Sequence, residues 1–317
     1  MKKSTKKREI YYSDFGVSEA SSRAFFHDSL SYGSFVYDFE TNQKYWMTAQ
    51  PKESEITAIT VDGKQVLAID TTFDTRKRFI RLVEVETQKE VAATKVAFGY
   101  EALFTPIDGV ILVRGDIKKR EKVVVLDIKT EEIQYTFPGA SPLSYGQLNE
   151  ELQTFVLPNP RKKAEVFTYN FQTKEANVIA LPAKRLIHRV ALLAKDTYFY
   201  IDGDYIATLF KDGVIVWQTA LDFDDSLHYA PDFFIRNNRV YFSCLYDSPA
   251  TEQKETRIPC FYTLNLATGK LENIQIPDSD YAGFFLPFLG NQVVNNFGMC
   301  IDLDNKKQSK LAPAIFI

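Results

Sequence analysis

Two groups of residues in this sequence have the types and spacing to do chemistry, and the first is a pair of histidines near carboxylates. His188 and His228 each lie at or just before the start of a predicted strand, and Asp222 and Asp225 precede His228 by six and three residues. Imidazole and carboxylate groups together bind divalent metals or transfer protons. One hypothesis is therefore a metal-dependent hydrolase or lyase. In it, the two histidines form a metal site with Asp222 or a catalytic site with Asp225. Against it stands the commoner role of histidine, a hydrogen bond within a loop.

The second group consists of basic triplets at regular intervals. The intervals from residue 76 to 118 and from 118 to 161 are 42 and 43 residues, and a basic pair follows. The members are Arg76-Lys77-Arg78, Lys118-Lys119-Arg120, Arg161-Lys162-Lys163 and Lys184-Arg185. Exposed loops are often charged for solubility alone. The functional interpretation is a docking surface for an anionic partner, which speeds and orients encounter.

The bulk charge favours a protein partner for that surface. The formal net charge is −3 and the pI is about 5.8, both unlike a typical nucleic-acid-binding domain. A protein with an acidic or phosphorylated surface is the predicted partner, and nucleic acid is the alternative. No run of about 18 apolar residues predicts a membrane span.

Other catalytic signatures are missing. The sequence has no phosphate-binding Gly-rich loop before a helix, no Gly-x-Ser-x-Gly and no His-Glu-x-x-His. Its three cysteines, Cys244, Cys260 and Cys300, lack zinc-site spacing. His27, inside a predicted strand, is interpreted as a packing residue. No cofactor is predicted, and a non-enzymatic binding scaffold is the preferred function.

The elements that position these residues repeat along the chain. Seven short strands of alternating apolar residues each end in a polar turn, with steps of 46, 43, 43, 38, 57 and 37 residues between equivalent positions. The mean step of 44 residues is that of a four-stranded propeller blade. The equivalent positions are Asp38, Glu84, Asp127, Asn170, Thr208, Asn265 and Asp302.

The Asp and Asn residues in this set are predicted to form turns, because their side chains accept hydrogen bonds from backbone N–H groups two residues on. Short Gly- or Asn-containing turns, such as Asp108-Gly109 and Asn237-Asn238, predict hairpins between the remaining strands. No segment of a dozen residues shows helical periodicity. The sequence therefore predicts an all-β protein, a seven-bladed β-propeller with four antiparallel strands per blade.

Strands within a blade are designated A to D from the channel outward. In this architecture the B–C loops and the D–A connections emerge on one face of the disc, which is called the loop face below. The basic triplets fall in the predicted B–C loops of blades 2, 3 and 4, so we expect them to lie side by side there. Acidic residues are expected on the other half of this face, and the insertion 247–259 falls in the B–C loop of blade 6.

The strand-turn unit, exemplified by Val124-Val125-Leu126-Asp127-Ile128-Lys129-Thr130, resembles those of WD40-like and YVTN (quinoprotein-like) propellers. The resemblance covers nearly all of residues 9–317 and implies architecture without an activity. The Trp-Asp dipeptide of WD40 repeats is absent, and Trp46 and Trp217 are too few for quinoprotein repeats.

The domain prediction follows from the repeat. Residues 1–8 are expected to form a basic tail, and residues 9–317 a single propeller. The predicted blades are 9–50, 51–97, 98–140, 141–183, 184–224, 225–277 and 278–317. The basic start is followed by no apolar run of signal-peptide length, which predicts a cytoplasmic protein.

Overall fold

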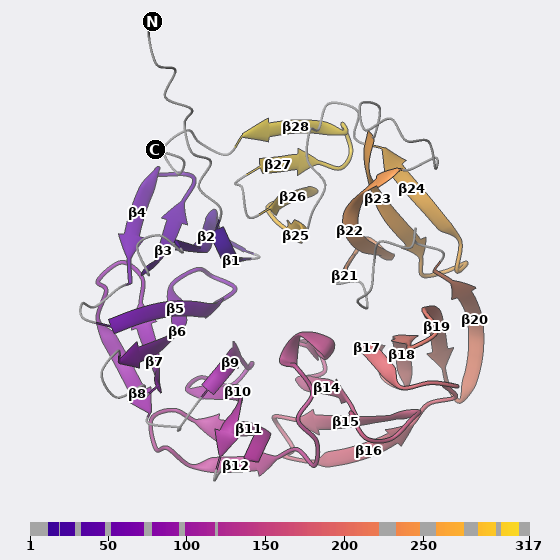
Figure 1. Cartoon of the computed structure of the whole chain (residues 1–317), viewed down its shortest axis with the longest axis horizontal. Helices are drawn as coiled ribbons and strands as arrows, with labels where there is room; N and C mark the ends of the chain where they lie inside the picture. Colours follow the sequence, from indigo (N-terminus) through magenta and orange to yellow (C-terminus); the bar gives the residue numbers. More distant parts are fainter. Residues whose placement is uncertain are drawn as a thin grey trace, which may run out of the picture.

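Seven four-stranded sheets form a closed ring in the computed structural model (Figure 1). The structure describes residues 12–18, 20–28, 33–47, 52–72, 78–94, 99–117, 120–221, 233–247, 258–275, 285–295 and 299–310. Every pair of neighbouring strands within a sheet is antiparallel, and each sheet uses four strands that are consecutive in the sequence. The predicted seven-bladed propeller is confirmed.

The first four blades contain strands β1 to β16. Their bounds are β1 Tyr12–Val17, β2 Arg23–Asp28, β3 Gly33–Asp38, β4 Gln43–Trp46, β5 Lys52–Ile59, β6 Gln65–Thr72, β7 Arg78–Glu84, β8 Glu90–Thr94, β9 Gly99–Phe104, β10 Val110–Ile117, β11 Arg120–Asp127, β12 Ile133–Thr136, β13 Gln147–Asn149, β14 Thr154–Pro158, β15 Glu165–Asn170 and β16 Ala176–Ala180. A single 3-10 turn, η1 Leu143–Tyr145, precedes β13.

The last three blades contain strands β17 to β28. Their bounds are β17 Ile187–Ala194, β18 Thr197–Asp202, β19 Ile206–Lys211, β20 Val214–Ala220, β21 Phe233–Arg236, β22 Arg239–Asp247, β23 Ile258–Asn265, β24 Leu271–Gln275, β25 Phe285–Pro287, β26 Gln292–Asn295, β27 Met299–Asp302 and β28 Lys307–Lys310. Most of the predicted insertion, residues 248–257, connects β22 to β23 and lies outside the described residues. No helix among the described residues has the length and apolar character needed to cross a bilayer.

The C–D turns form as the sequence predicts. The Asp127 carboxylate accepts the backbone N–H groups of Lys129 and Thr130 at 2.9 and 3.0 Å. The Asn170 amide oxygen accepts those of Gln172 and Thr173 at 3.0 and 2.8 Å. The same pair of hydrogen bonds recurs at Asp38, Asn265 and Asp302. These side chains therefore hold the C–D turns, as the sequence predicts.

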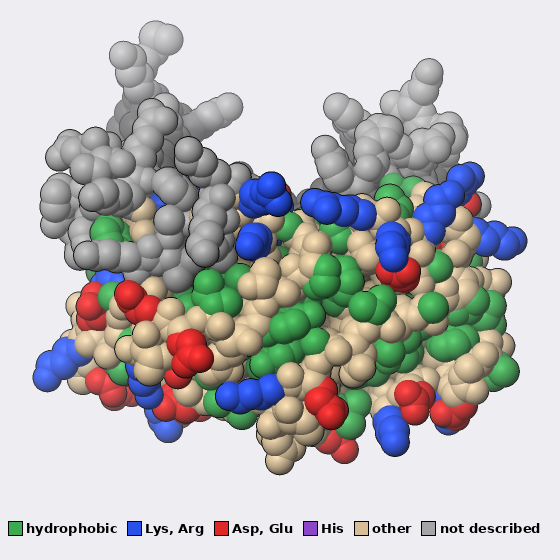
Figure 2. All heavy atoms as spheres, turned by 90° about the horizontal axis from the view of Figure 1, so that it is seen from below, with side chains coloured by type: hydrophobic (Ala, Val, Ile, Leu, Met, Phe, Trp, Pro, Cys, Tyr) green, Lys and Arg blue, Asp and Glu red, His purple; other side chains and the backbone are tan. Residues whose placement is uncertain are grey.

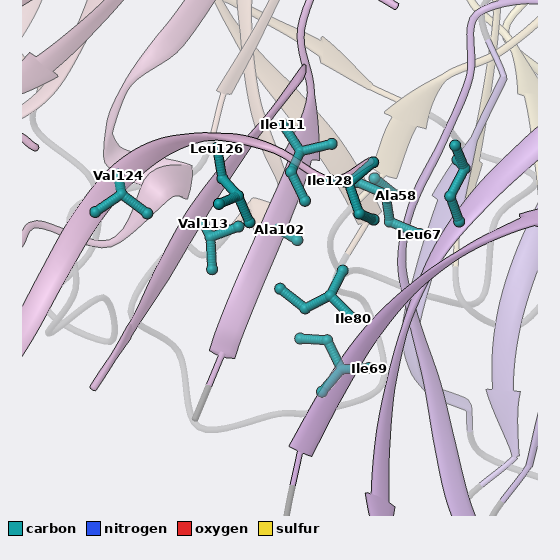
Figure 3. Close-up of a cluster of buried hydrophobic side chains, with 11 residues drawn as sticks. Ala58, Leu67, Ile69, Ile80, Ala102, Ile111, Val113, Val124, Leu126 and Ile128 are labelled. Carbon is teal, nitrogen blue, oxygen red and sulfur yellow. The ribbon is translucent and has the colours of Figure 1, made fainter. Parts of the chain in front are cut away.

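The hydrophobic core lies between blades rather than inside one layer. Strand alternation sends odd and even residues to opposite faces of each sheet. In blade 3, Val124 and Leu126 face blade 2, whereas Val123 and Val125 face blade 4. Figure 3 shows the first of these interfaces, where Ile69 and Ile80 of blade 2 belong to the same cluster of buried side chains as Val124 and Leu126 of β11.

Hydrogen bonds from side chains to backbone carbonyls also link neighbouring blades. Arg23 donates to the Gly63 carbonyl at 3.1 Å, from blade 1 to blade 2. Equivalent links join blades 4 and 5, 5 and 6, and 6 and 7, each with a donor–acceptor distance below 3.0 Å. They are Asn149 to Leu192, Trp217 to Leu266, and Arg236 to Phe288.

A buried polar network joins blades 1 and 2. Asp70 is fully buried and forms an ion pair with Arg81, with Nε–Oδ2 at 2.7 Å. Ser54 donates to Asp70 at 2.8 Å, and the Ser34 hydroxyl donates to the Ser54 carbonyl at 3.0 Å. His27 completes the chain at 3.0 Å from Ser34 and is only 7% exposed, in agreement with its predicted packing role.

The ring closes by side-chain packing between blades 7 and 1. Phe39 of blade 1 meets Phe288 of blade 7 edge to face, with ring centroids 5.3 Å apart. Val17 and Phe39 pack on a cluster of Phe288, Val294 and Cys300. Among the described residues, the last sheet contains only β25 to β28, so no strand is exchanged between the two blades.

Candidate functional site

The described members of the basic triplets lie at the strand ends of the loop face. Arg78 begins β7, and Arg120 begins β11. The Arg161–Lys163 triplet connects β14 to β15, while Lys184 and Arg185 connect β16 to β17. The remaining predicted residues, Arg76, Lys77, Lys118 and Lys119, lie outside the described residues.

We call the described cations of this surface the basic arc. Figure 2 shows Lys and Arg side chains gathered along one rim of the disc, whereas acidic and basic side chains are mixed along the opposite rim. The arc also includes Lys122, whose atoms line a hollow together with those of two predicted residues. Its members are Arg78, Arg120, Lys122, Arg161, Lys162, Lys163, Lys184 and Arg185.

The start of β11 lies at the loop face of blade 3, between blades 2 and 4. Its register with β10 is continuous, so the alternation set by the buried valines extends to its first residues. Alternation places the Glu121 side chain on the side of blade 4 and those of Arg120 and Lys122 on the side of blade 2, although all three residues contribute atoms to the hollow between blades 3 and 4. By the same rule Arg78 faces blade 3, because Ile80 and Leu82 of β7 pack against that blade.

A hollow of about 540 Å³ lies where blade 3 meets blade 4. Arg120, Lys122 and Arg161 contribute atoms to its wall, so the structure brings cations of two predicted triplets together. The connection from β12 to η1 and Pro160 form the apolar part of the wall. Gly139 is required there, because a Cβ atom on it would come within 2.6 Å of the Pro160 Cδ atom.

The carboxylates beside the arc already have cationic partners. Glu121 forms an ion pair with Arg114, which also binds Glu101 at 2.5 Å. Glu165 binds Lys162 at 3.2 Å, and Asp204 of the predicted acidic half binds Arg185 at 3.1 Å. Within the described part of the chain, the remaining arc members with no ion pair are Arg120, Lys122, Arg161, Lys163 and Lys184.

The histidine hypothesis gains no support from the described residues. His188 is the second residue of β17, as predicted, and is partly exposed. His228, Asp222 and Asp225 lie outside the described residues. No group of three or more potential metal ligands occurs in the part of the chain that the structure describes. Asp202, the last residue of β18, is buried and accepts backbone N–H groups of Asp204 and Ile206 at 3.0 and 3.1 Å.

Cys300 is a structural thiol. Burial raises its pKa to about 11, so the group is protonated at neutral pH. Its side chain packs with Phe288 and Val294 in the interface that closes the ring.

Sequence reasoning missed the hollow and the ion pairs that border it. Lys122 follows Arg120 by two residues and was not distinguished from an ordinary strand residue. The Pro138-Gly139 dipeptide was a usable signal, because it marks a tight connection near the third basic triplet. No comparable signal identifies Arg114 as the partner of Glu101 and Glu121, since that contact depends on strand pairing.

Comparison with known proteins identifies the fold. No protein-family model and no curated protein matches the sequence. Among solved structures, an uncharacterized protein from Listeria monocytogenes is 14% identical, with a TM-score of 0.63 and 97% of both chains covered. Hsv2 from Kluyvelomyces marxianus is 12% identical, with a TM-score of 0.62 and coverage of 96% of this chain and 99% of that one.

A third solved structure is a WD40 β-propeller domain. The WD40 β-propeller domain of Doa1 is 10% identical, with a TM-score of 0.56 and coverage of 95% of this chain and 92% of that one. Identities this low show a shared fold alone. The protein is a seven-bladed β-propeller, a fold that it shares with the WD40 β-propeller domain of Doa1.

Proposed function

We propose that the protein is a non-enzymatic binding module whose basic arc receives an acidic or phosphorylated segment of a partner protein. The observation that carries this proposal is the distribution of ion pairs. Arg120, Lys122 and Arg161 line one hollow and have no ion pair among the described residues, although nearby carboxylates are paired. The arc therefore retains cations that an anionic ligand can neutralise.

The shape of the site favours a polypeptide ligand. A hollow of about 540 Å³ is larger than one carboxylate or phosphate group and accommodates a few residues. Phe137 and Pro160 give part of the wall an apolar character, which suits the uncharged side chains of a peptide. Arg120 and Arg161 supply planar guanidinium groups, which bind carboxylate or phosphate oxygens in pairs.

The first prediction concerns charge reversal in the arc. The triple variant Arg120→Glu, Arg161→Glu, Lys163→Glu should bind poly-L-glutamate and a multiply phosphorylated casein peptide at least tenfold more weakly than the wild type. The melting temperature should stay unchanged, because these side chains are exposed and make no ion pair among the described residues. Fluorescence anisotropy at fixed ionic strength measures the binding, and a duplex DNA probe tests the nucleic-acid alternative.

The matched control changes net charge by the same amount on the opposite face. Lys89→Glu, Lys195→Glu and Lys211→Glu replace three exposed lysines near the A–B and C–D turns. This control should retain peptide binding. Equal weakening by both triple variants would show that only net charge matters and would contradict a site at the arc.

A further inference from the structure

The outermost strands of the blades differ in how they are protected against pairing with a strand of another molecule. A D strand is the edge of its sheet and presents unpaired backbone N–H and C=O groups, so natural proteins place charges there. Four D strands follow this rule, with Lys44 in β4, Glu90 in β8, Glu272 in β24 and Lys307 in β28. The D strands β12, β16 and β20 carry no charged residue.

Strand β20 is the longest of the three. It has seven residues, against four in β12 and five in β16. Its first three side chains are apolar and exposed: Val214 by 62%, Ile215 by 42% and Val216 by 48%. Within the described part of the chain, β20 pairs only with β19, so its outer edge has no strand partner.

The surroundings of β20 extend this apolar surface. Figure 1 shows β16 and β20 following one another around the circumference, and Figure 2 shows hydrophobic side chains in the band between the two rims. A hollow of about 550 Å³ lies between the two strands, lined by Leu181, Phe210 and Val214 among others. Val178 of β16 is 56% exposed. The sequence of β20 is rich in β-branched residues, which favour pairing with another strand.

We propose that β20 pairs antiparallel with β20 of a second copy of this chain, forming a two-fold dimer with one continuous eight-stranded sheet. In a pairing centred on Trp217, the two-fold axis places Val216 of one copy opposite Gln218 of the other and diagonally across from the other copy's Val216, so like charges at this position would repel each other. Val214–Ala220 contains no charge, and no register of self-pairing opposes like charges within it. One isologous contact also covers the open edges of both copies at once.

The composition of the strand favours a second copy over an anionic or cationic partner. A partner selected by charge would need charged residues along β20, as the basic arc has on the loop face, and the strand has none. The apolar side chains at its start give the pairing a hydrophobic contact besides the backbone hydrogen bonds. The dimer contact and the basic arc use different surfaces, so each is tested separately.

The second prediction is therefore a dimer in solution. Light scattering after size exclusion should give the full chain twice its mass of 36.3 kDa at micromolar concentration. Val216→Lys should weaken self-association at least tenfold in sedimentation velocity, because it places two ammonium groups near each other across the axis. The control Val91→Lys alters a valine of β8 with similar exposure, 47%, and should leave the mass of the dimer unchanged.

A charge-pairing experiment keeps the proposal testable if Val216→Lys fails to dimerise only because that variant is unfolded. Val216→Glu should also be monomeric, and an equimolar mixture of the two variants should regain the mass of the dimer. Circular dichroism of each variant verifies the fold. A monomeric wild type over the whole concentration range, a dimer that survives Val216→Lys, or a folded mixture that stays monomeric would each overturn the proposal.

Discussion

The Asp or Asn that opens a C–D turn fixes the local backbone through hydrogen bonds to its own side chain. Asp38 does this and also binds Arg23, with Oδ2 at 3.0 Å from the Arg23 Nε atom. Burial raises the pKa of Asp38, but hydrogen bonds from Arg23, Thr41 and Ser22 outweigh it, so the pKa lies below its ordinary value of 3.8. A lowered pKa in the folded chain means that the ionised carboxylate stabilises the fold.

The third prediction is a pH dependence at this residue. Because the pKa of Asp38 is depressed, its stabilisation is present above the ordinary pKa and is lost as the pH falls below about 4. Asp38→Asn should lower the melting temperature at pH 7 and reduce the further loss on acidification. Thermal melts at several pH values measure both effects. If the melting temperatures of variant and wild type fell in parallel down to acidic pH, this would contradict the assignment of a depressed pKa to Asp38.

The turn residues were predictable because their hydrogen bonds are local. A carboxylate and the N–H groups it binds are two or three residues apart, so a single stretch such as Asp127 to Thr130 contains the whole motif. Blade 5 departs from this pattern. Its equivalent residue, Thr208, binds Gln218 across the sheet, and the turn there uses Asp212 and Gly213 with φ of 50° and 83°.

At the scale of elements, the contacts between blades depend on partners far apart in the sequence. The Trp217 indole and the Leu266 carbonyl are 49 residues apart, and the Leu143 N–H donates to Glu101 over 42 residues. The repeat predicted which loops would be neighbours, and the hollow lined by Arg120 and Arg161 agrees with it. The neutralisation of Glu121 by Arg114 could not be predicted, because it depends on how β10 pairs with β11.

The fourth prediction concerns the buried ion pair between Asp70 and Arg81 in blade 2. Asp70→Asn leaves the Arg81 guanidinium without its carboxylate at a site where the Arg81 side chain is only 11% exposed. Loss of one member of a buried pair costs about 3–5 kcal/mol. Urea unfolding should show a loss of that size.

The control for this experiment is an exposed pair on the same blade. Lys64 and Asp62 lie 3.1 Å apart with both side chains more than half exposed. Asp62→Asn should change the free energy of unfolding by less than about 1 kcal/mol. A similar loss in both variants would mean that Asp70 and Arg81 contribute no more than a surface pair.

At the scale of the whole molecule, the ring depends on one interface that connects its first and last blades. The other six interfaces join blades that are consecutive in the sequence, whereas blades 7 and 1 meet only after the chain has completed the circle. Val17 and Phe39 of blade 1 pack there against Phe288, Val294 and Cys300. Loss of this packing is expected to open the ring as well as create a cavity.

The fifth prediction is made at this interface. Phe288→Ala removes a ring that is 2% exposed and should lower the free energy of unfolding by about 3–5 kcal/mol. Amide hydrogen exchange should rise first in β1 to β4 and β25 to β28, since only these blades share the altered interface. Exchange that rises uniformly in all seven blades would indicate that ring closure is no weaker than any other contact.

Among the described strands none is exchanged between blades, and this has a consequence for how such a chain changes in evolution. Each blade is encoded by one uninterrupted stretch of sequence, from its innermost to its outermost strand. A single in-frame duplication or deletion of about 44 codons therefore adds or removes a complete structural unit. Neither event would split a sheet between two distant parts of the gene.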